Sequence, residues 1–112
     1  MPEKLPFTIN ELVENPWNEM RVYSLNEDQK KELVDNKKIV KNEYFFRNGT
    51  EWAEHSHKKP QLLLVLEGQL IHRVNNNNYV QNTNDLLIMP ADLPHTAHAD
   101  KDIHLYWFTK HK

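Results

Sequence analysis

The sequence contains no cysteine, so disulfide bonds and thiolate-bound metal sites are both excluded. It also lacks a strong excess of charge of either sign, since the formal net charge is -2 with the seven histidines counted as neutral. A balance this close to zero gives no bulk electrostatic attraction to nucleic acid or to an anionic membrane surface. We therefore expect neither nucleic acid nor a membrane among the partners.

Long apolar runs are absent as well, and the residues after Met1 do not form a basic segment followed by an apolar one. No stretch approaches the roughly 20 apolar residues that cross a bilayer as a helix. These absences favour a cytoplasmic protein. At 112 residues, with 38% hydrophobic and 27% charged residues, the chain has the length and composition of one globular domain.

Most of the chain from Lys38 onward is a series of short apolar segments separated by turn-forming residues. We expect strands over about 38–47, 52–57, 61–67, 69–74, 79–82, 86–89, 96–99 and 103–109, with turns at 67–68, 75–78, 82–85 and 99–102. Eight or so short strands with frequent turns are typical of a β-sandwich or a closed barrel.

The first third of the chain has a different character. Residues 1–20 are polar and punctuated by proline, which predicts an arm that lies over a surface, with one helical turn near 10–14. A short strand is expected at 21–25. Asn26 is a candidate N-cap, and Glu27 and Asp28 would occupy the first turn of a short surface helix over 27–34.

The run Leu62–Leu66 is apolar on both faces, so both sides of that strand should be covered. With Gln61 facing the interior, Leu63 and Val65 line the lumen and the other three leucines point outward. We expect a second copy of the chain to cover this outward stripe, which predicts a homodimer. The alternative is that the arm and the short helix cover it within one chain.

The candidate site residues are histidines in two separate segments. His55 and His57 alternate along one extended segment, and Gln61 shares their face if the chain stays extended through Pro60. A third histidine, His95, follows an apolar run that ends in a proline-bounded turn. Three imidazole nitrogens and one amide oxygen suit a divalent transition metal. Taken alone, His55 and His57 would equally fit surface histidines at a strand end.

These residues resemble the two sequence motifs of the cupin family. The first motif is a glycine, five residues, His-x-His, three or four residues, a glutamate, six residues and a glycine. Here Gly49, His55, His57, Gln61 and Gly68 keep every spacing, with glutamine in place of glutamate.

The second cupin motif is a glycine, five residues, Pro-x-Gly, two residues, a histidine, three residues and an asparagine. It resembles Asn84, Pro90, Asp92, His95 and Ala99. Both glycines and the asparagine are replaced, but the proline and the histidine fall at the expected places. The two motifs and the strands between them span about half of the chain.

The resemblance implies a small RmlC-like cupin of the cupin 2 type. Its fold would be all-β, a double-stranded β-helix or jelly-roll barrel, as a single domain over residues 1–112 with the arm at 1–20 and the barrel at 37–109. The implied metal ligands are His55, His57, Gln61 and His95. Iron, manganese, nickel, copper and zinc all remain open, because mixed nitrogen and oxygen ligands bind each of them.

The glutamine is the main departure from the first motif. A carboxylate would cancel one unit of the metal's charge, whereas the Gln61 amide leaves the full charge on the site. This favours an anionic substrate group and the lower oxidation state of a redox metal. The alternative is that Gln61 only forms a hydrogen bond within the lumen and the metal has three ligands.

Three kinds of function remain open. An exchangeable metal position beside an apolar lumen suits a metal-dependent oxygenase, isomerase or lyase acting on a small oxygenated molecule, although the sequence supplies no clear general acid or base. A non-catalytic small-ligand sensor is the second. Residues 61–68, 86–90 and 105–108 resemble the ligand-binding domain of arabinose-type transcription regulators, although we expect no DNA-binding domain and no direct DNA binding here. The third is a barrel without metal that serves in assembly.

The alternation of side chains along a strand also suggests where other residues face. His98 has the wrong parity to join His95 and is expected at the surface or rim, and Glu54 should face away from His55. The facing of His72 and His104 is open; either could reach the lumen as a proton-transfer group, but a packed or exposed position is the simpler expectation. The aromatic residues expected in the core are Tyr44, Phe46, Trp52, Trp107 and Phe108.

Overall fold

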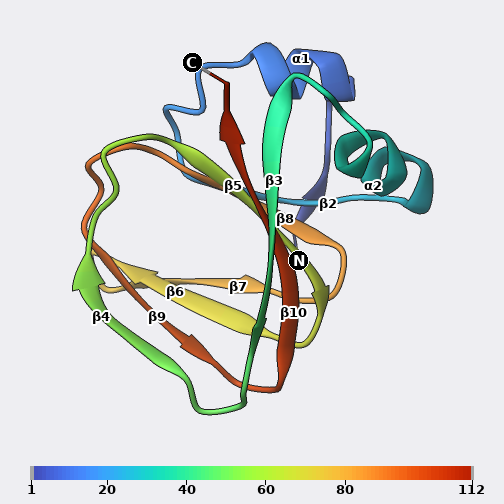
Figure 1. Cartoon of the computed structure of the whole chain (residues 1–112). Coiled ribbons are helices and arrows are strands. Elements are labelled where there is room, and N and C mark those ends of the chain that lie inside the picture. The colour runs from blue at the N-terminus through green and yellow to red at the C-terminus, as the bar shows by residue number, and fades with distance from the viewer. Residues whose placement is uncertain (1, 112) are drawn as a thin grey trace.

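The computed structural model describes residues 2–111, which form two β-sheets and two short helices (Figure 1). In chain order the elements are β1 (Glu3–Lys4), α1 (Ile9–Glu14), β2 (Arg21–Ser24), α2 (Glu27–Val34), β3 (Ile39–Phe46), β4 (Glu51–His55), β5 (Gln61–Glu67), β6 (Leu70–Val74), β7 (Asn77–Gln81), β8 (Asp85–Met89), β9 (His95–Ala99) and β10 (Ile103–Lys110). The fold is the all-β jelly-roll barrel that the sequence predicted.

The two sheets face each other (Figure 1), and residues from both line the cavity between them. The larger sheet has the strand order β1-β2-β8-β5-β10-β3, and the smaller has the order β4-β9-β6-β7. Apart from the parallel pair β1 and β2, every strand pairing is antiparallel. Strand β1 has only two residues and was not predicted. None of the helices in residues 2–111 is long and apolar enough to cross a membrane.

The predicted elements agree with the structure except at two places. The asparagine run was expected to be a turn throughout, but only Asn75 and Asn76 turn, both with positive φ, and β7 begins at Asn77. The other difference concerns the first histidine segment. Strand β4 ends at His55, and the chain bends at 58–59 instead of staying extended through Pro60. His57 therefore projects from a loop.

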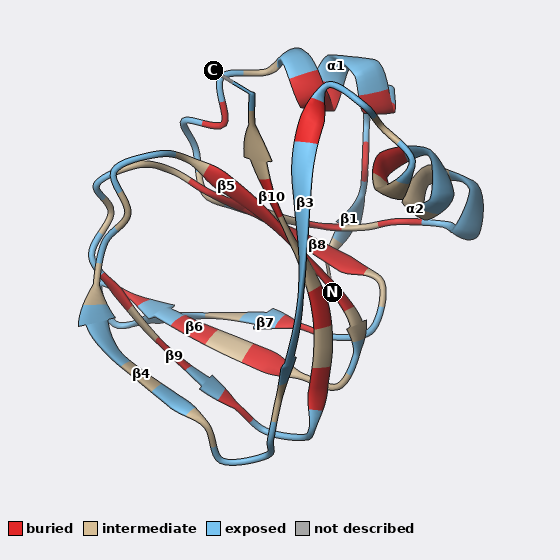
Figure 2. Ribbon diagram, viewed as in Figure 1, coloured by how far each residue is buried: buried red, intermediate tan, exposed pale blue. Residues whose placement is uncertain are grey.

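Strand β5 is buried on both faces, as its uniform apolarity predicted (Figure 2). Leu63 and Val65 face the lumen and pack in a cluster with residues of β6, β8, β9 and β10. Leu62 and Leu64 face the other way and have no exposed surface. The strand thus separates two apolar clusters, one inside the barrel and one outside it.

The expectation that a second copy of the chain covers the outward stripe is wrong. Residues of the N-terminal segment and of α2 bury Leu62 and Leu64 within one chain; they include Leu5, Ile9, Leu12, Val13, Trp17 and Leu33. Leu66 is partly buried against the same cluster. Trp17 is fully buried, and its indole Nε1–H donates to the carbonyl of Leu12 at 2.7 Å, so its polar atom is satisfied there.

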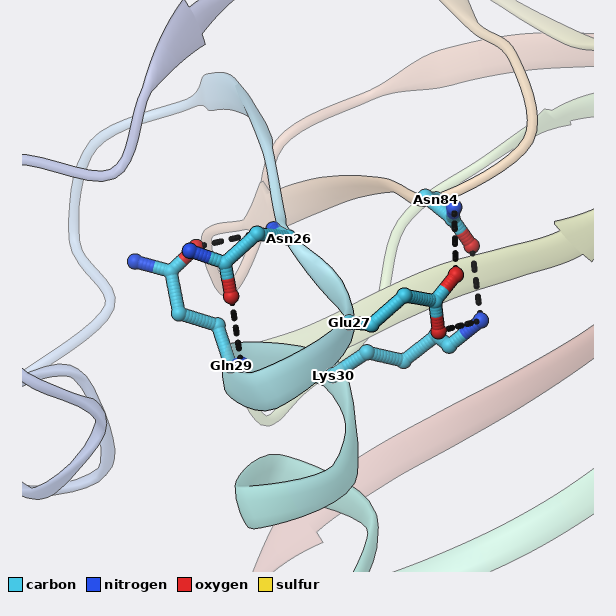
Figure 3. A network of polar contacts seen from close by, with 5 residues as sticks. All are labelled: Asn26, Glu27, Gln29, Lys30 and Asn84. Carbon is cyan, nitrogen blue, oxygen red and sulfur yellow. Dashed lines mark hydrogen bonds and ion pairs between the residues drawn. The ribbon is translucent and has the colours of Figure 1, made fainter.

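Both helices begin with a reciprocal capping box, which satisfies backbone N–H groups that have no partner inside the helix. In α1 the partners are Thr8 and Glu11, and in α2 they are Asn26 and Gln29 (Figure 3). The N-cap predicted at Asn26 and the helix over 27–34 are confirmed.

The two glycine positions of the second motif keep a left-handed backbone although neither residue is glycine. Asn84 has φ of +70° and Asp92 has φ of +59°. Asparagine and aspartate tolerate this conformation better than most residues, because their short polar side chains form local hydrogen bonds. Asn84 is bonded to α2, since its Oδ1 accepts from Lys30 Nζ at 3.1 Å (Figure 3). Both positions therefore adopt a conformation that glycine favours, although neither residue is glycine.

Gly68 and Gly49 offer a matched test of backbone crowding. Both have positive φ, +100° and +88°, but a Cβ at Gly68 would clash with the Asp102 carbonyl oxygen, whereas one at Gly49 would meet nothing within 4 Å. We expect Gly49→Ala to lower the free energy of unfolding by roughly 1–2 kcal/mol through backbone strain alone. Gly68→Ala should cost clearly more because the backbone must also move. Urea denaturation of the two variants measures this, and equal losses would contradict it.

Candidate metal centre

The barrel brings the two histidine segments together by direct strand pairing. Strand β4 lies antiparallel to β9, and in this register His55 is the cross-strand partner of His95. A register shift between Trp52 and His55 marks an irregularity just before this pair. The loop after β4 is bonded to the turn before β9, because the Asp92 N–H donates to the carbonyl of His57 at 2.7 Å.

The three predicted histidines form one cluster. Their ring centroids are 4.9 Å apart for His55 and His57, 4.4 Å for His55 and His95, and 5.4 Å for His57 and His95. One ring nitrogen from each lies within 4.8 Å of the others. Nitrogen ligands bonded to one ion at about 2.0–2.1 Å stay within about 4.2 Å of one another, so small side-chain shifts would let these residues hold a metal.

Hydrogen bonds fix which nitrogen two of these rings present. The Nδ1 of His55 bonds the carbonyl oxygen of Ala53 at 2.7 Å, and the Nδ1 of His95 bonds that of Leu93 at 2.8 Å. A carbonyl only accepts, so both Nδ1 atoms carry the proton and both Nε2 lone pairs are free when the rings are neutral. Metal-binding histidines are commonly oriented in this way.

The electrostatics of the cluster favour neutral rings. Burial lowers the pKa of His57 below its usual value, and the neighbouring His55 and His95 lower it further. Burial likewise lowers the pKa of His95, although the bond to Leu93 opposes this. A metal competes with protons for imidazole nitrogen, so a lowered pKa leaves the lone pairs available near neutral pH.

Gln61 lines the same cavity as the three histidines. Its side chain is buried, and among the described residues its Oε1 has no hydrogen-bond partner. An unpaired buried oxygen is unusual in a folded protein and costs free energy unless something else satisfies it. The donor set of three neutral imidazoles and one unpaired amide oxygen fits a divalent transition metal.

The cavity beside the cluster is small, about 50 Å3, and its walls are mostly apolar. Three of the aromatic residues expected in the core form part of its lining, namely Phe46, Trp52 and Trp107. Trp107 meets His57 edge to face at 5.3 Å, and Phe46 meets Trp52 in the same way at 4.8 Å. Of these three rings, Trp107 packs directly against the histidine cluster.

His72, whose facing the sequence left open, is a buried residue of this cavity. It is 2% exposed, and its ring centroid lies 6.4 Å from that of His95. Its Nε2 lies 2.7 Å from Gln81 Oε1, while its Nδ1 has no partner among the described residues. In the sequence of β6, Leu70, His72 and Val74 alternate with Ile71 and Arg73, and because Ile71 is apolar as well, this pattern did not fix the facing of His72.

The other assigned side chains lie outside the cavity. His98 and Glu54 are exposed, as predicted. His104 also faces outward, where its Nε2 lies 2.6 Å from Glu43 and its ring stacks on Phe45. Phe108 is fully buried as expected, but Tyr44 is 40% exposed and does not belong to the core.

The barrel and its inward-facing histidines define a small cupin domain. More specifically, residues 43–111 match the family model described as the AraC-like ligand binding domain, and the chain belongs to that family. No curated protein matches the chain.

Solved structures share the fold at low sequence identity. A DUF861 family protein from Thermotoga maritima is 17% identical with a TM-score of 0.62, covering 80% of this chain and 97% of its own. A cupin superfamily protein from Desulfitobacterium hafniense is 17% identical with a TM-score of 0.59, covering 100% and 95%. A salicylate 1,2-dioxygenase from Pseudaminobacter salicylatoxidans is 20% identical with a TM-score of 0.59 over 65% of this chain, and the match spans only 21% of the dioxygenase chain.

The buried His72 predicts a pH dependence of stability. Burial lowers its pKa to about 4, against 6.5 for a free imidazole, although the bond to Gln81 opposes the shift. The unfolded chain then binds more protons between these values, so His72 contributes stability above pH 6.5 that is lost as the pH falls towards 4. The difference corresponds to roughly 3 kcal/mol. Unfolding measured from pH 7 to pH 4 should show a shallower decline for His72→Phe than for the wild type, and parallel curves would contradict this.

Proposed function

We propose that the protein binds one divalent transition metal through His55, His57, His95 and Gln61, and that it uses the metal to bind and convert a small oxygenated molecule. The observation that carries this proposal is the convergence of three imidazole rings from β4, its loop and β9, with ring nitrogens within 4.8 Å. The backbone carbonyls that orient His55 and His95 support it, because they direct both Nε2 lone pairs away from the backbone.

The chemistry of the site follows from what the chain supplies around the ion. A bound metal of this class acts as a Lewis acid towards an oxygen of the ligand. Because all four proposed protein ligands are neutral, the site keeps the whole charge of the ion and favours an anionic group such as a carboxylate. The aromatic and aliphatic walls suit the apolar part of a small molecule, of which a cavity of about 50 Å3 encloses only a portion.

The class of substrate is proposed from this chemistry. The dioxygenase from Pseudaminobacter salicylatoxidans acts on salicylate, and one of its structures holds gentisate. Both are small aromatic acids with hydroxyl groups, which combine an anionic oxygen with an apolar ring. A molecule of this kind would satisfy both the cation and the apolar wall here. Small hydroxy acids therefore head the set of compounds to be tested.

The metal proposal predicts the outcome of single substitutions in untagged protein. We expect close to one metal ion per chain in the wild type and a strong loss in His57→Ala, because the histidine supplies a ligand and cannot be replaced by solvent at the same affinity. His98→Ala is the matched control, since that histidine is exposed on the same strand as His95. Elemental analysis measures the content.

Gln61→Leu separates four-ligand from three-ligand binding in the same measurement. If Gln61 is a ligand, the variant should bind the metal about 10-fold or more weakly. Unchanged affinity would mean that the metal has three protein ligands. Equal metal content in His57→Ala and His98→Ala would contradict the proposed metal site as a whole.

A non-catalytic binding module is the second candidate, and the match to the AraC-like ligand binding domain favours it. The two functions give different results with metal-loaded protein and a panel of small hydroxy acids, keto acids, diols and phenols. An enzyme should consume one of these compounds, with or without oxygen uptake, and lose this activity in His57→Ala. A binding module should show a raised melting temperature with a compound that it leaves chemically unchanged.

The homodimer stays a prediction, but the stripe on β5 no longer supports it because the chain covers that stripe itself. Among the described residues, Val40, Tyr44 and Phe45 are large apolar side chains that remain exposed, and all three lie on β3. Tyr44 and Phe45 point to opposite faces of the strand, and β3 is an edge of the six-stranded sheet, so this edge is the better candidate for contact with a second copy.

A further inference from the structure

The orientation of the buried Gln81 amide is fixed by two backbone carbonyls. Its Nε2 donates to the carbonyl oxygen of Leu63 at 2.9 Å and to that of Asp85 at 3.1 Å. Because both partners only accept, the amide nitrogen must lie on that side. The amide oxygen is then directed at His72, and Gln81 has no exposed surface through which solvent could compete.

This amide in turn fixes the tautomer of His72. The distance from His72 Nε2 to Gln81 Oε1 is 2.7 Å, and the amide oxygen only accepts, so Nε2 carries the proton. Burial keeps the ring neutral by lowering its pKa to about 4. In a neutral imidazole the other nitrogen is an acceptor, so His72 Nδ1 bears a lone pair.

The His72 Nδ1 lone pair is one of two polar groups in the cavity wall that have no hydrogen-bond partner among the described residues. Among the described residues only Gln61 Oε1 and His72 Nδ1 are buried side-chain polar atoms without a hydrogen-bond partner, and both residues line the same cavity. The metal proposed above would satisfy the Gln61 oxygen. It leaves the His72 nitrogen, which comes from β6 on the other sheet, in need of a hydrogen-bond donor.

We propose that His72 Nδ1 accepts a hydrogen bond from the bound ligand, so that the site selects small acids that carry a hydroxyl or amine N–H besides the metal-binding oxygen. This inference rests on the proposed function, because the metal binds the acid group of the ligand while His72 Nδ1 accepts a hydrogen bond from its hydroxyl or amine. The ligand group beside His72 must be a donor, since an acceptor at that place would face the His72 lone pair and leave both atoms unpaired.

The test compares salicylate with benzoate, which lacks the hydroxyl and is smaller, so steric exclusion cannot explain weaker binding. With metal-loaded wild type, calorimetric titration should give salicylate about threefold to tenfold higher affinity, the effect of one net hydrogen bond. In His72→Phe, which keeps a ring but offers no acceptor, the ratio should fall to about one. His72→Asn places an amide oxygen near the former Nδ1 and should restore part of it. The control His98→Phe should leave the ratio unchanged.

Metal content measured in every variant separates the two proposals. Loss of discrimination in His72→Phe with the metal retained supports the role of His72, whereas wild-type protein without metal overturns the proposed function instead. An unchanged ratio in His72→Phe overturns the inference and means that only water satisfies the nitrogen. A metal-independent readout is the 15N spectrum of labelled histidine. Without metal it should show His72 protonated at Nε2 alone, and a proton on Nδ1 would contradict the proposal. In metal-loaded protein the Nδ1 resonance should also shift on addition of salicylate.

Discussion

The burial of β5 on both faces is the constraint on which the rest of the structure depends. A strand with leucine or valine at five successive positions cannot present either face to water without a large loss of hydrophobic free energy. Its outward face therefore requires the N-terminal segment and α2, which bury Leu62 and Leu64. Its inward face gives the lumen its apolar wall, with Gln61 at the start of the strand as the polar exception. One strand thus creates both the outer layer and the dry environment of the site.

That dry environment explains the electrostatics of the cavity. Burial penalises charged imidazole, so the pKa values of His57, His95 and His72 are all lowered, with burial as the largest cause for each. Neutral rings expose lone pairs, which is what both a metal and a ligand hydroxyl need. The same low polarity makes unpaired Gln61 Oε1 and His72 Nδ1 costly. A site of this kind is stabilised when ligands fill it, which couples binding to stability.

Local sequence patterns predicted most of the fold, because turns, caps and apolar runs are local signals. They also placed His55, His57 and His95 in one site, but only through motif spacing, since the pairing of β4 with β9 is a long-range contact. Two features could not be found in this way. The apolar residues of the arm were visible, yet nothing local told which surface they would cover. The facing of His72 depended on the register in which β6 pairs with β7 and β9, and a shift of that register by one residue reverses every side chain.

The turn between β7 and β8 is bonded to α2 of the outer layer and lies close to Gln81, which bonds His72 in the cavity. The backbone therefore fixes the orientation of His72 through the Gln81 amide. Asn84 donates its N–H to the Val65 carbonyl at 2.7 Å and receives Lys30 of α2 on its side chain. A few residues away, Gln81 is held by the carbonyls of β5 and the start of β8. If the amide turned over, its oxygen would face these two carbonyl oxygens, and both hydrogen bonds to the main chain would be lost. The acceptor on His72 is therefore set before any ligand arrives, as expected of a preorganised site.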